Sequence, residues 1–524
     1  MSNNRSFSSR LFVNSIWNAS AYIFSTFIGI ISAPLYINIL GIKQYGLFIL
    51  LTSILLPFGL LNFGFAEATI KYVSESIAKG LYDEANEYVR STLLFNILVG
   101  LFGSITIIVS ARFLSTRIFK IEASDQLLAE KILYWIAATW FVNQVSATFS
   151  GIPVAFQRYS IVSIGNSLYV SLNVIIGLII LWMNGNILSL VEFRLIWSLI
   201  MLILWFLIAR KLLRNIKFWP KWSRDSFKKS FKFGFWQTMA DIGSIVANQS
   251  DKYVLGAYLS TSVVGLYNIA STVQQSIYIL VFKVSDVLFP AFSALQGSKQ
   301  NDRAVRLMLR SSWLLSALTV IIMGPIIVIS YDVLRIYVGV SIAEVAHYTL
   351  RLFIYGAFLS SASIAVNQYL LGTGNVKWTS IMTISSGIIV VVSDLFLIPR
   401  IGLIATGISD IMMLLPRPII QYFFWRKFLF DDVSCGEMYG YLYSPVITGA
   451  IATTILSWVY TEIRFTPNLF VCLIIAVITS IFLGFIIIYI DRFVPGGRQR
   501  GNDIIFLIYN VRLRIIRLIS RLGV

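Results

Sequence analysis

The segment Gly46-Leu47-Phe48 recurs 219 residues later as Gly265-Leu266-Tyr267 (265 − 46 = 219). The same shift pairs residues far to either side of it: Trp17 with Trp236, Ser25 with Ser244, Glu67 with Asp286, and Arg158-Tyr159-Ser160 with Lys377-Trp378-Thr379. A register that holds this far is not expected by coincidence. Both copies are strongly apolar, and two apolar copies in one register indicate a duplicated, two-lobed membrane transporter.

The composition indicates a polytopic membrane protein without a large soluble domain. Hydrophobic residues make up 57% of the 524 residues and charged residues only 13%, about half the charge of a typical soluble protein. Cys435 and Cys472 are too few for a disulfide framework, and a single histidine, His347, excludes a multi-histidine metal site. The first apolar stretch is too long for a cleavable signal and is interpreted as a signal anchor.

Long apolar runs predict fourteen membrane helices. Their expected spans are 13–38, 44–66, 88–110, 128–151, 159–183, 188–209, 233–257, 262–290, 308–331, 344–371, 378–397, 402–425, 441–461 and 467–490. The shift maps the first six onto the next six. Because six is even, the two lobes should share one orientation and be related by an axis along the membrane normal.

The predicted organisation follows from this repeat. The expected parts are an N-terminal lobe (1–210), a basic cytoplasmic linker (211–232), a C-terminal lobe (233–430), helices thirteen and fourteen (431–490) and a basic amphipathic cytoplasmic tail (491–524). The fold class is an all-α polytopic membrane protein with two pseudo-symmetric six-helix bundles and two C-terminal helices.

Lysine and arginine are distributed unevenly between the two sides of the predicted membrane. With the N-terminus inside, the inner segments collect 30 of the 42 basic residues, nine of them between Arg210 and Lys232, and Arg417 is counted in this inner set. Positive charge accumulates on the cytoplasmic side of membrane proteins. Both termini are therefore predicted to be cytoplasmic.

Polar residues recur at helical spacing on the first helix of each lobe. They are Asn18, Tyr22, Ser25, Gly29 and Ser32 in one copy and Gln237, Asp241, Ser244, Asn248 and Asp251 in the other. The 219 shift converts the first stripe into the second. Polar side chains in hydrocarbon normally face other helices or water, so the stripes are predicted to line a common cavity. The alternative is that each stripe holds helices together within its own lobe.

Further charges lie at predicted membrane depth, among them Glu67, Lys283, Asp286, Arg351 and Asp394. Lys283 and Arg351 are predicted to bind an anionic substrate, and Asp241, Asp251, Glu67 and Asp286 are the candidates for coupling to a proton or cation. Lys283 and Asp286 are close enough in sequence to pair instead as a structural tie.

Several chemistries are not expected. The chain has no Walker A motif, no H-E-x-x-H motif and no Cys/His ligand set, so no catalytic residues, metal or cofactor are predicted. The basic linker carries no aromatic platform for nucleic acid and is interpreted as topogenic, lipid-facing charge. The predicted outer loops are short, which argues against a membrane-embedded polymerase or glycosyltransferase.

Several short motifs resemble a known family. They are Leu40-Gly41-Ile42-Lys43-Gln44-Tyr45-Gly46-Leu47-Phe48, Asn62-Phe63-Gly64-Phe65, Lys71-Tyr72, Asp251-Lys252-Tyr253-Val254-Leu255-Gly256, Val264-Gly265-Leu266-Tyr267, Phe289-Pro290-Ala291-Phe292-Ser293-Ala294-Leu295 and Leu397-Ile398-Pro399-Arg400-Ile401-Gly402. In this order and spacing they resemble the Wzx-type O-antigen flippases of the multidrug/oligosaccharidyl-lipid/polysaccharide (MOP) exporter superfamily. The likeness covers roughly residues 10–430.

The resemblance implies two six-helix bundles around a central cavity that works by alternating access. It also implies the substrate, an undecaprenyl-diphosphate-linked oligosaccharide for O-antigen, lipopolysaccharide or another surface polysaccharide, turned from the inner to the outer leaflet of the bacterial inner membrane. Coupling to a proton or sodium gradient is implied too. Membrane lipids and other polysaccharide-assembly membrane proteins are the expected partners, and nucleic acid is not.

One departure and one alternative accompany the resemblance. The stripe on the first helix is uncharged, whereas lipid-II flippases of the superfamily are expected to carry arginines there, which argues against a peptidoglycan role. The alternative within transport is a cation-coupled multidrug exporter that would use Asp241 and Asp251 on a cationic solute.

Overall fold

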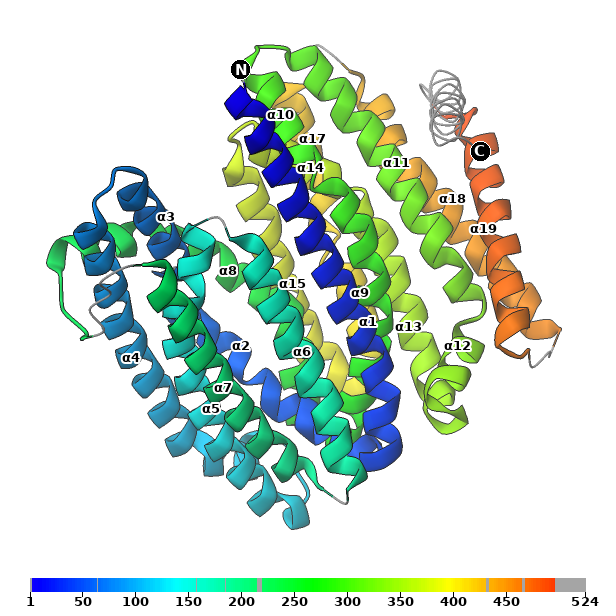
Figure 1. The fold of residues 1–524 in the computed structure, drawn as a ribbon. Coiled ribbons are helices and arrows are strands. Elements are labelled where there is room, and N and C mark those ends of the chain that lie inside the picture. Colours follow the sequence, from blue (N-terminus) through cyan, green and yellow to red (C-terminus); the bar gives the residue numbers. More distant parts are fainter. Residues whose placement is uncertain are drawn as a thin grey trace, which may run out of the picture. The chain divides into compact units, whose positions relative to one another are not determined.

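The computed structural model describes residues 2–63, 65–156, 158–183, 185–213, 219–429, 433–463 and 467–494, and these residues form helices without strands (Figure 1). The first part of the chain contains α1 (Ser2–Ser53), α2 (Leu55–Phe58), the 3-10 turn η1 (Gly59–Asn62), α3 (Phe65–Ala78), α4 (Tyr82–Phe113), the π-turn η2 (Leu114–Ile118), α5 (Ala123–Ala155), α6 (Tyr159–Trp182) and α7 (Ile187–Leu212). The middle contains α8 (Arg224–Tyr258), α9 (Thr261–Ser285), α10 (Leu288–Gly297), α11 (Asn301–Val328), α12 (Ser330–Val338), α13 (Val340–Ser361) and α14 (Ile364–Gly372). The last part contains α15 (Val376–Ile401), α16 (Ile404–Met412), α17 (Pro416–Phe428), α18 (Cys435–Glu462) and α19 (Leu469–Asp491).

Thirteen of the fourteen predicted segments each coincide with one of these helices or with a consecutive pair, and the segment 44–66 covers the end of α1, α2, η1 and the start of α3. The predicted break between the first two segments is a kink at Gly41, whose φ of 75° is a left-handed value that favours glycine. Ten helices among the described residues are long and apolar enough to cross a membrane. The all-α polytopic fold is thus confirmed, and the count of fourteen spans stays a prediction.

Helix starts are marked by polar side chains that cap free backbone N–H groups. The Asn468 side chain accepts from the Val471 N–H at 3.0 Å at the start of α19, and Ser434 does the same for Glu437 at 3.2 Å before α18. Ser223 caps α8 in this way, so the last nine residues of the predicted 211–232 linker (224–232) are helical rather than loop. The sequence analysis missed this start because basic charge dominates the segment. The predicted amphipathic tail lies outside the described residues.

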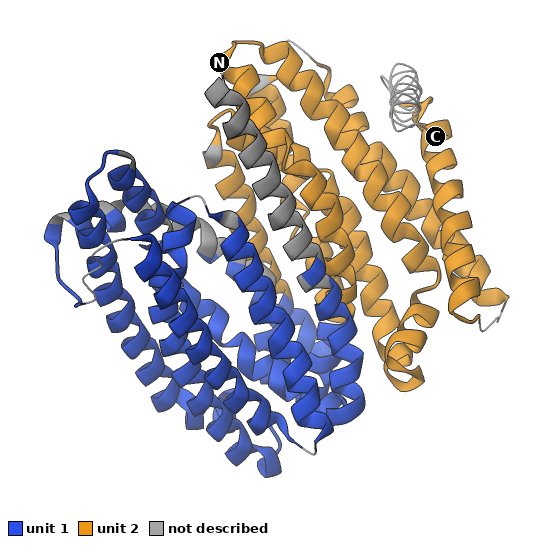
Figure 2. Ribbon diagram, in the orientation of Figure 1, with its two compact units in different colours: residues 1–269, 394–402 blue, residues 270–393, 403–524 orange. Residues whose placement is uncertain are grey.

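The chain forms two compact units, coloured separately in Figure 2. Unit 1 contains residues 1–269 and 394–402, and unit 2 contains residues 270–393 and 403–524. These limits differ from those of the predicted lobes, because contacts place the end of α8 and the start of α9 with α1. The lobes were defined by the repeat rather than by contacts, and they remain a prediction.

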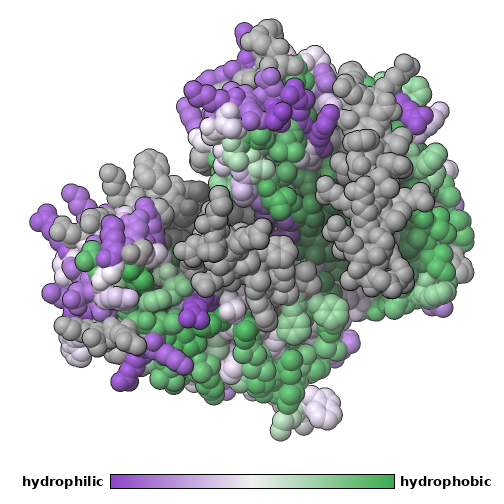
Figure 3. All heavy atoms as spheres, turned by 45° about the horizontal axis from the view of Figure 1, so that its top comes forward, coloured by the Kyte–Doolittle hydropathy of each residue, from purple (hydrophilic) through white to green (hydrophobic). Residues whose placement is uncertain are grey.

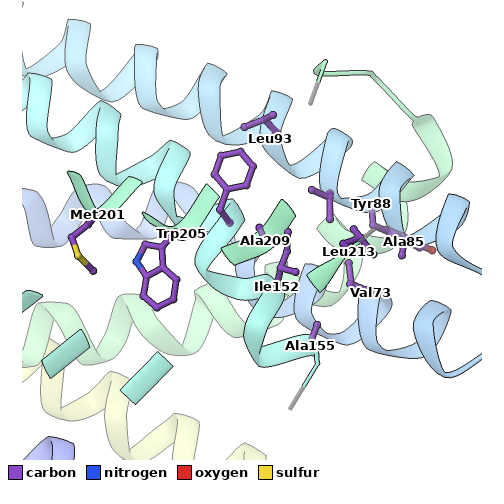
Figure 4. Close-up of a cluster of buried hydrophobic side chains, with 12 residues drawn as sticks. Val73, Ala85, Tyr88, Leu93, Ile152, Ala155, Met201, Trp205, Ala209 and Leu213 are labelled. Atoms are coloured by element: carbon purple, nitrogen blue, oxygen red, sulfur yellow. The ribbon is translucent and has the colours of Figure 1, made fainter. Parts of the chain in front are cut away.

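In unit 1, helices α3, α4, α5 and α7 pack on one another around an apolar cluster. Figure 4 shows side chains from these helices meeting there, including Val73, Leu93, Ile152 and Trp205, all 6% exposed or less. A buried hydrogen bond joins two of the helices within the same bundle, from the Asn96 amide on α4 to Thr148 Oγ1 on α5 at 2.9 Å. Apolar burial and interhelical hydrogen bonds are the usual means of joining membrane helices.

The two copies of the repeat meet within unit 1 at equivalent residues. A Cβ added to Gly46 on α1 would lie 1.7 Å from the Thr261 carbonyl oxygen on α9, and one added to Gly265 would lie 2.8 Å from the Ile42 carbonyl oxygen. The 219 shift relates Gly46 to Gly265 and Ile42 to Thr261. The contact is therefore reciprocal, as at a two-fold axis, and the close backbone approach requires glycine on both sides.

In unit 2, α11 is packed against α18, α19, α13 and α14. Small residues allow close approach here as well, since a Cβ on Gly324 of α11 would lie 2.5 Å from Leu483 of α19. Ser444 Oγ on α18 donates to Asp491 Oδ1 on α19 at 2.6 Å, and both residues are buried. The last two long helices are thus firmly attached to this unit.

The surfaces fit a membrane environment. Figure 3 shows hydrophobic residues along the sides of the helices and hydrophilic residues gathered where helices are connected, as between α3 and α4 and between α10 and α11. One face of α19 exposes a continuous apolar row that includes Phe470, Leu473, Val477, Ile481 and Phe485. Apolar surface of this extent is typical of helices that face lipid.

Candidate functional site

The structure describes only part of the two predicted cavity stripes. The backbones of α1 and α8 are helical through both, but the side chains of seven candidates lie outside the described ones: Asn18, Tyr22, Ser25, Gln237, Asp241, Ser244 and Asn248. The Glu67 side chain lies outside them too. The cavity and coupling roles of these eight residues therefore stay predictions.

Asp251, the last member of the second stripe, lies in a buried polar cluster of unit 1. Asp251 is 2% exposed, and its Oδ2 accepts a hydrogen bond from the Tyr267 hydroxyl on α9 at 2.8 Å. The neighbouring Ser250 donates to Oδ2 of the fully buried Asp394 on α15 at 3.1 Å. The cluster therefore holds two carboxyl groups in an apolar helical region. Sequence analysis placed Asp394 at membrane depth but gave it no role.

Lys283 and Asp286, in contrast, form an exposed pair. Lys283 Nζ lies 2.9 Å from Asp286 Oδ2, and both side chains are 46% exposed. This is the alternative pairing that their spacing allows. Exposed ion pairs contribute little to stability, and Asp286 partly neutralises the ammonium group. Substrate binding by Lys283 and coupling by Asp286 stay predictions.

A second polar cluster, which we call the Arg417 cluster, lies in unit 2. Arg417 Nη1 on α17 donates to Ser360 Oγ on α13 at 3.1 Å, and one turn later Gln421 Nε2 donates to Ser363 Oγ at 3.1 Å. The Tyr443 hydroxyl on α18 donates to Gln421 Oε1 at 2.7 Å. Arg417, Ser360, Ser363, Gln421 and Tyr443 thus join helical segments from three parts of unit 2.

The Arg417 guanidinium has no acidic partner among the described residues. Its Nε is buried and has no hydrogen-bond partner there either. Arg417 lies inside a helical segment, as its predicted span 402–425 implies, next to uncharged hydroxyl and amide groups, and its place on the inner side of the membrane stays a prediction. Buried arginine normally pairs with a carboxylate. An arginine without one is suited to an anion that comes from outside the protein.

An apolar groove adjoins this cluster. It encloses about 480 Å³ between α17, α18 and α19, and its lining includes Pro418, Tyr439, Tyr443, Ile447 and Ile490. Pro418 follows Arg417 directly, and Tyr443 belongs both to the groove and to the cluster. The arrangement can hold a long apolar chain beside an anionic polar group.

Arg351, the other predicted substrate-binding cation, lies in a separate pocket of unit 2. The pocket encloses about 430 Å³ between α13, α16 and α18. Arg351 Nε donates to Ser330 Oγ on α12 at 2.6 Å, so the guanidinium is held at one edge. Arg351 and the Arg417 cluster line different cavities, with no lining residue in common.

Comparisons with known proteins identify the family. A family model described as "Polysaccharide biosynthesis protein" matches residues 11–296, more than half of the chain. The chain belongs to this polysaccharide biosynthesis protein family. The MatE family model also matches residues 242–396. Two models on overlapping parts of the chain agree with the predicted MOP superfamily membership.

One curated relative and two solved structures show where the similarity lies. An O-antigen transporter candidate of Shigella flexneri is 23% identical over 418 residues, which are 79% of this chain and 97% of the relative. The lipid II flippase MurJ in an inward closed conformation superposes with a TM-score of 0.67 at 18% identity over 90% of this chain and 98% of MurJ. An inward-facing multidrug resistance MATE family transporter of the MOP superfamily gives 0.66 at 13% identity over 77% of this chain and 94% of its own.

These matches establish the fold of this chain and indicate that it is a transport protein rather than an enzyme. The three proteins share nearly their whole length with this chain, and their names describe transporters and flippases rather than enzymes. The predicted Wzx-type, MOP superfamily assignment is confirmed. The multi-pass membrane character is confirmed as well.

Proposed function

We propose that this family member is a flippase that moves an undecaprenyl-diphosphate-linked oligosaccharide from the inner to the outer leaflet by alternating access. The observation that carries the proposal is the apolar groove directly beside the Arg417 cluster. A lipid-linked oligosaccharide has three parts, namely an apolar chain, an anionic diphosphate and neutral sugars, and this part of unit 2 offers a complementary surface to each.

The groove suits the lipid chain because its described lining is mostly aromatic and aliphatic. Apolar chain atoms can pass from the bilayer into the groove at little cost, because both surroundings are apolar. The tail can also remain in the bilayer while the polar part enters the protein, so the whole substrate need not be enclosed.

The Arg417 guanidinium suits the diphosphate. It carries several N–H donors in a planar fork that matches phosphate oxygens, and no described carboxylate competes for them. Ser360 and Tyr443, which are partly exposed, can hydrogen-bond to sugar hydroxyls, while the fully buried Gln421 and Ser363 hold the cluster together. Flipping requires no covalent catalyst, because the lipid-linked substrate leaves chemically unchanged.

Coupling to a proton or sodium gradient is assigned to carboxyl groups at predicted membrane depth. Asp251 and Asp394 are the candidates described as buried, and Asp241, Glu67 and the exposed Asp286 are retained from the sequence. Burial disfavours the charged carboxylate, so uptake of a proton or cation changes the energy of this helical region. We assign the protein to the bacterial inner membrane with both termini in the cytoplasm, in contact with other polysaccharide-assembly membrane proteins.

The runner-up is a cation-coupled multidrug exporter, favoured by the MatE match over residues 242–396. An arginine without an acidic partner among the described residues is unfavourable beside a cationic solute, so the Arg417 cluster favours the flippase. Deletion of the gene followed by localisation of the lipid-linked oligosaccharide tests the choice. We expect accumulation in the inner leaflet. Unpolymerised units that reach the outer leaflet would instead indicate a polymerase, and an unchanged distribution with increased drug sensitivity would indicate the exporter.

A further inference from the structure

The Arg351 pocket has features that a lipid-facing crevice does not need. It lies between the middle of α13 and the last turns of α18, and Tyr348, Arg351, Tyr355, Thr454, Ser457 and Trp458 line it. These six residues combine one cation, three aromatic side chains and the aliphatic hydroxyl groups of Thr454 and Ser457. They all belong to unit 2.

One edge of the Arg351 guanidinium is hydrogen-bonded within the protein, and the N–H groups of its terminal nitrogens remain available to a ligand. Its Nε donates to the fully buried Ser330, and its guanidinium carbon lies 5.9 Å from the centre of the Tyr348 ring. Within the described part of the chain, neither terminal nitrogen forms a hydrogen bond or an ion pair. The guanidinium is thus oriented by the protein and not neutralised by it.

Ser457 provides a second, independent indication of a ligand. It is 5% exposed, and its hydroxyl has no hydrogen-bond partner among the described residues. Two other hydroxyl groups of the lining are engaged, since Thr454 Oγ1 hydrogen-bonds with the Tyr355 hydroxyl at 2.8 Å and donates to the Ala450 carbonyl at 2.7 Å. A buried hydroxyl without a partner is unfavourable, and a ligand oxygen in the pocket would satisfy it.

The position of the pocket indicates where such a ligand comes from. Trp458 and Tyr348 are 66% and 54% exposed, and α18 ends at Glu462, four residues after Trp458. Exposed tryptophan near a helix end marks the depth of lipid headgroups. An aromatic belt explains Trp458, but it does not explain why, among the described residues, the arginine has no acidic partner and the Ser457 hydroxyl has no hydrogen-bond partner.

We propose that this pocket binds the phosphate group of an anionic membrane lipid. The Arg351 terminal N–H groups and the Ser457 hydroxyl donate to phosphate oxygens, and Tyr348 and Trp458 flank the headgroup. The inference does not depend on the proposed flippase function, because it uses none of the residues of the Arg417 cluster. A phospholipid and a polyprenyl phosphate share the required chemistry, and the experiment separates them.

The test is native mass spectrometry of the purified full chain with three added lipids: dioleoylphosphatidylglycerol, decaprenyl phosphate and zwitterionic dioleoylphosphatidylcholine. We expect one of the two anionic lipids to bind more tightly than phosphatidylcholine, and the tighter one identifies the source. Arg351→Gln should weaken that binding about tenfold to a hundredfold, the range for charged hydrogen bonds. Arg306→Gln is the matched control, since Arg306 is an exposed arginine of the same unit on α11.

A second variant keeps the test informative if Arg351→Gln does not fold. Ser457→Ala removes only a hydroxyl that bonds no described residue, so the protein should fold normally and bind the lipid about threefold to tenfold more weakly. Equal binding of all three lipids, or anionic-lipid binding that is unchanged in both Arg351→Gln and Ser457→Ala, would overturn the proposal.

Discussion

Replacing Gly46 by alanine should destabilise unit 1 strongly, because the added methyl group has no space. The new Cβ would lie 1.7 Å from the Thr261 carbonyl oxygen, whereas ordinary contacts begin near 3.4 Å, so the backbones must separate by the difference of 1.7 Å. Overpacking of a well-packed contact costs about 1–3 kcal/mol. We expect a loss of stability at the upper end of this range, about 3 kcal/mol. The nearest atoms, from Thr261 and Gly265, belong to the backbone, and they cannot move aside by a change of side-chain rotamer.

The assay is thermal unfolding of the detergent-solubilised full chain, followed by size-exclusion chromatography after heating. At about 2 °C per kcal/mol for a unit of this size, Gly46→Ala should lower Tm by about 6 °C. Gly265→Ala should have a smaller effect, because its Cβ would lie 2.8 Å from its nearest neighbours, one of them a side-chain carbon of Ile42. Gly29→Ala is the control on the same helix, with nothing within 4 Å of the added Cβ. A Gly46→Ala protein that melts with the wild type, or a Gly29→Ala protein that is equally destabilised, would refute the reasoning.

Three further predictions concern the polar clusters and the attachment of the last helices. Arg417→Gln should reduce transport of the lipid-linked oligosaccharide about tenfold or more, while Arg426→Gln, at an exposed arginine near the end of the same helix, should transport normally; equal activities in complementation of a deletion strain would exclude Arg417 as the diphosphate ligand. Asp251→Asn still accepts the Tyr267 hydrogen bond but cannot take up a proton, so transport should lose its response to a collapsed proton gradient while the protein still folds; a response like that of the wild type would remove Asp251 from coupling. Ser444→Ala takes a donor from the buried Asp491 carboxylate and should cost about 1–3 kcal/mol, seen as a lower Tm, and an unchanged Tm would mean that water replaces the lost donor.

The helical architecture was predictable because each membrane helix must satisfy its own backbone and expose an apolar surface. These requirements produce runs of about 20 apolar residues, which are visible in the sequence. The first two runs are separated at Gly41, where the helix is kinked. The start of α8 was missed for a local reason: Ser223 caps the helix inside a segment whose basic charge suggested a loop.

The candidate site was less predictable, since its composition depends on which helices become neighbours. Arg417 was counted among the inner basic residues without a role, and only the packing of α17 on α13 shows that it bonds Ser360 and lacks a described acid. A local signal was available, because Pro416 and Pro418 enclose a single arginine in a long apolar run. Arg351 was recognised as a cation at membrane depth, but Thr454, Ser457 and Trp458, which complete its pocket, come from α18, about a hundred residues away.

The reciprocal contact of Gly46 and Gly265 bears on how the two copies could diverge after duplication. When two identical subunits meet at a two-fold axis, every substitution acts on both sides of the interface at once. Fusion into one chain removes that constraint, and each side can then change alone. Ile42 and Thr261 have become different residues, and the carbonyl oxygens that touch the glycines are backbone atoms whose place does not depend on the side chain. The interface therefore tolerates divergence at the residues that supply carbonyls but not at the glycines, which explains how two unlike halves can keep one crossing point.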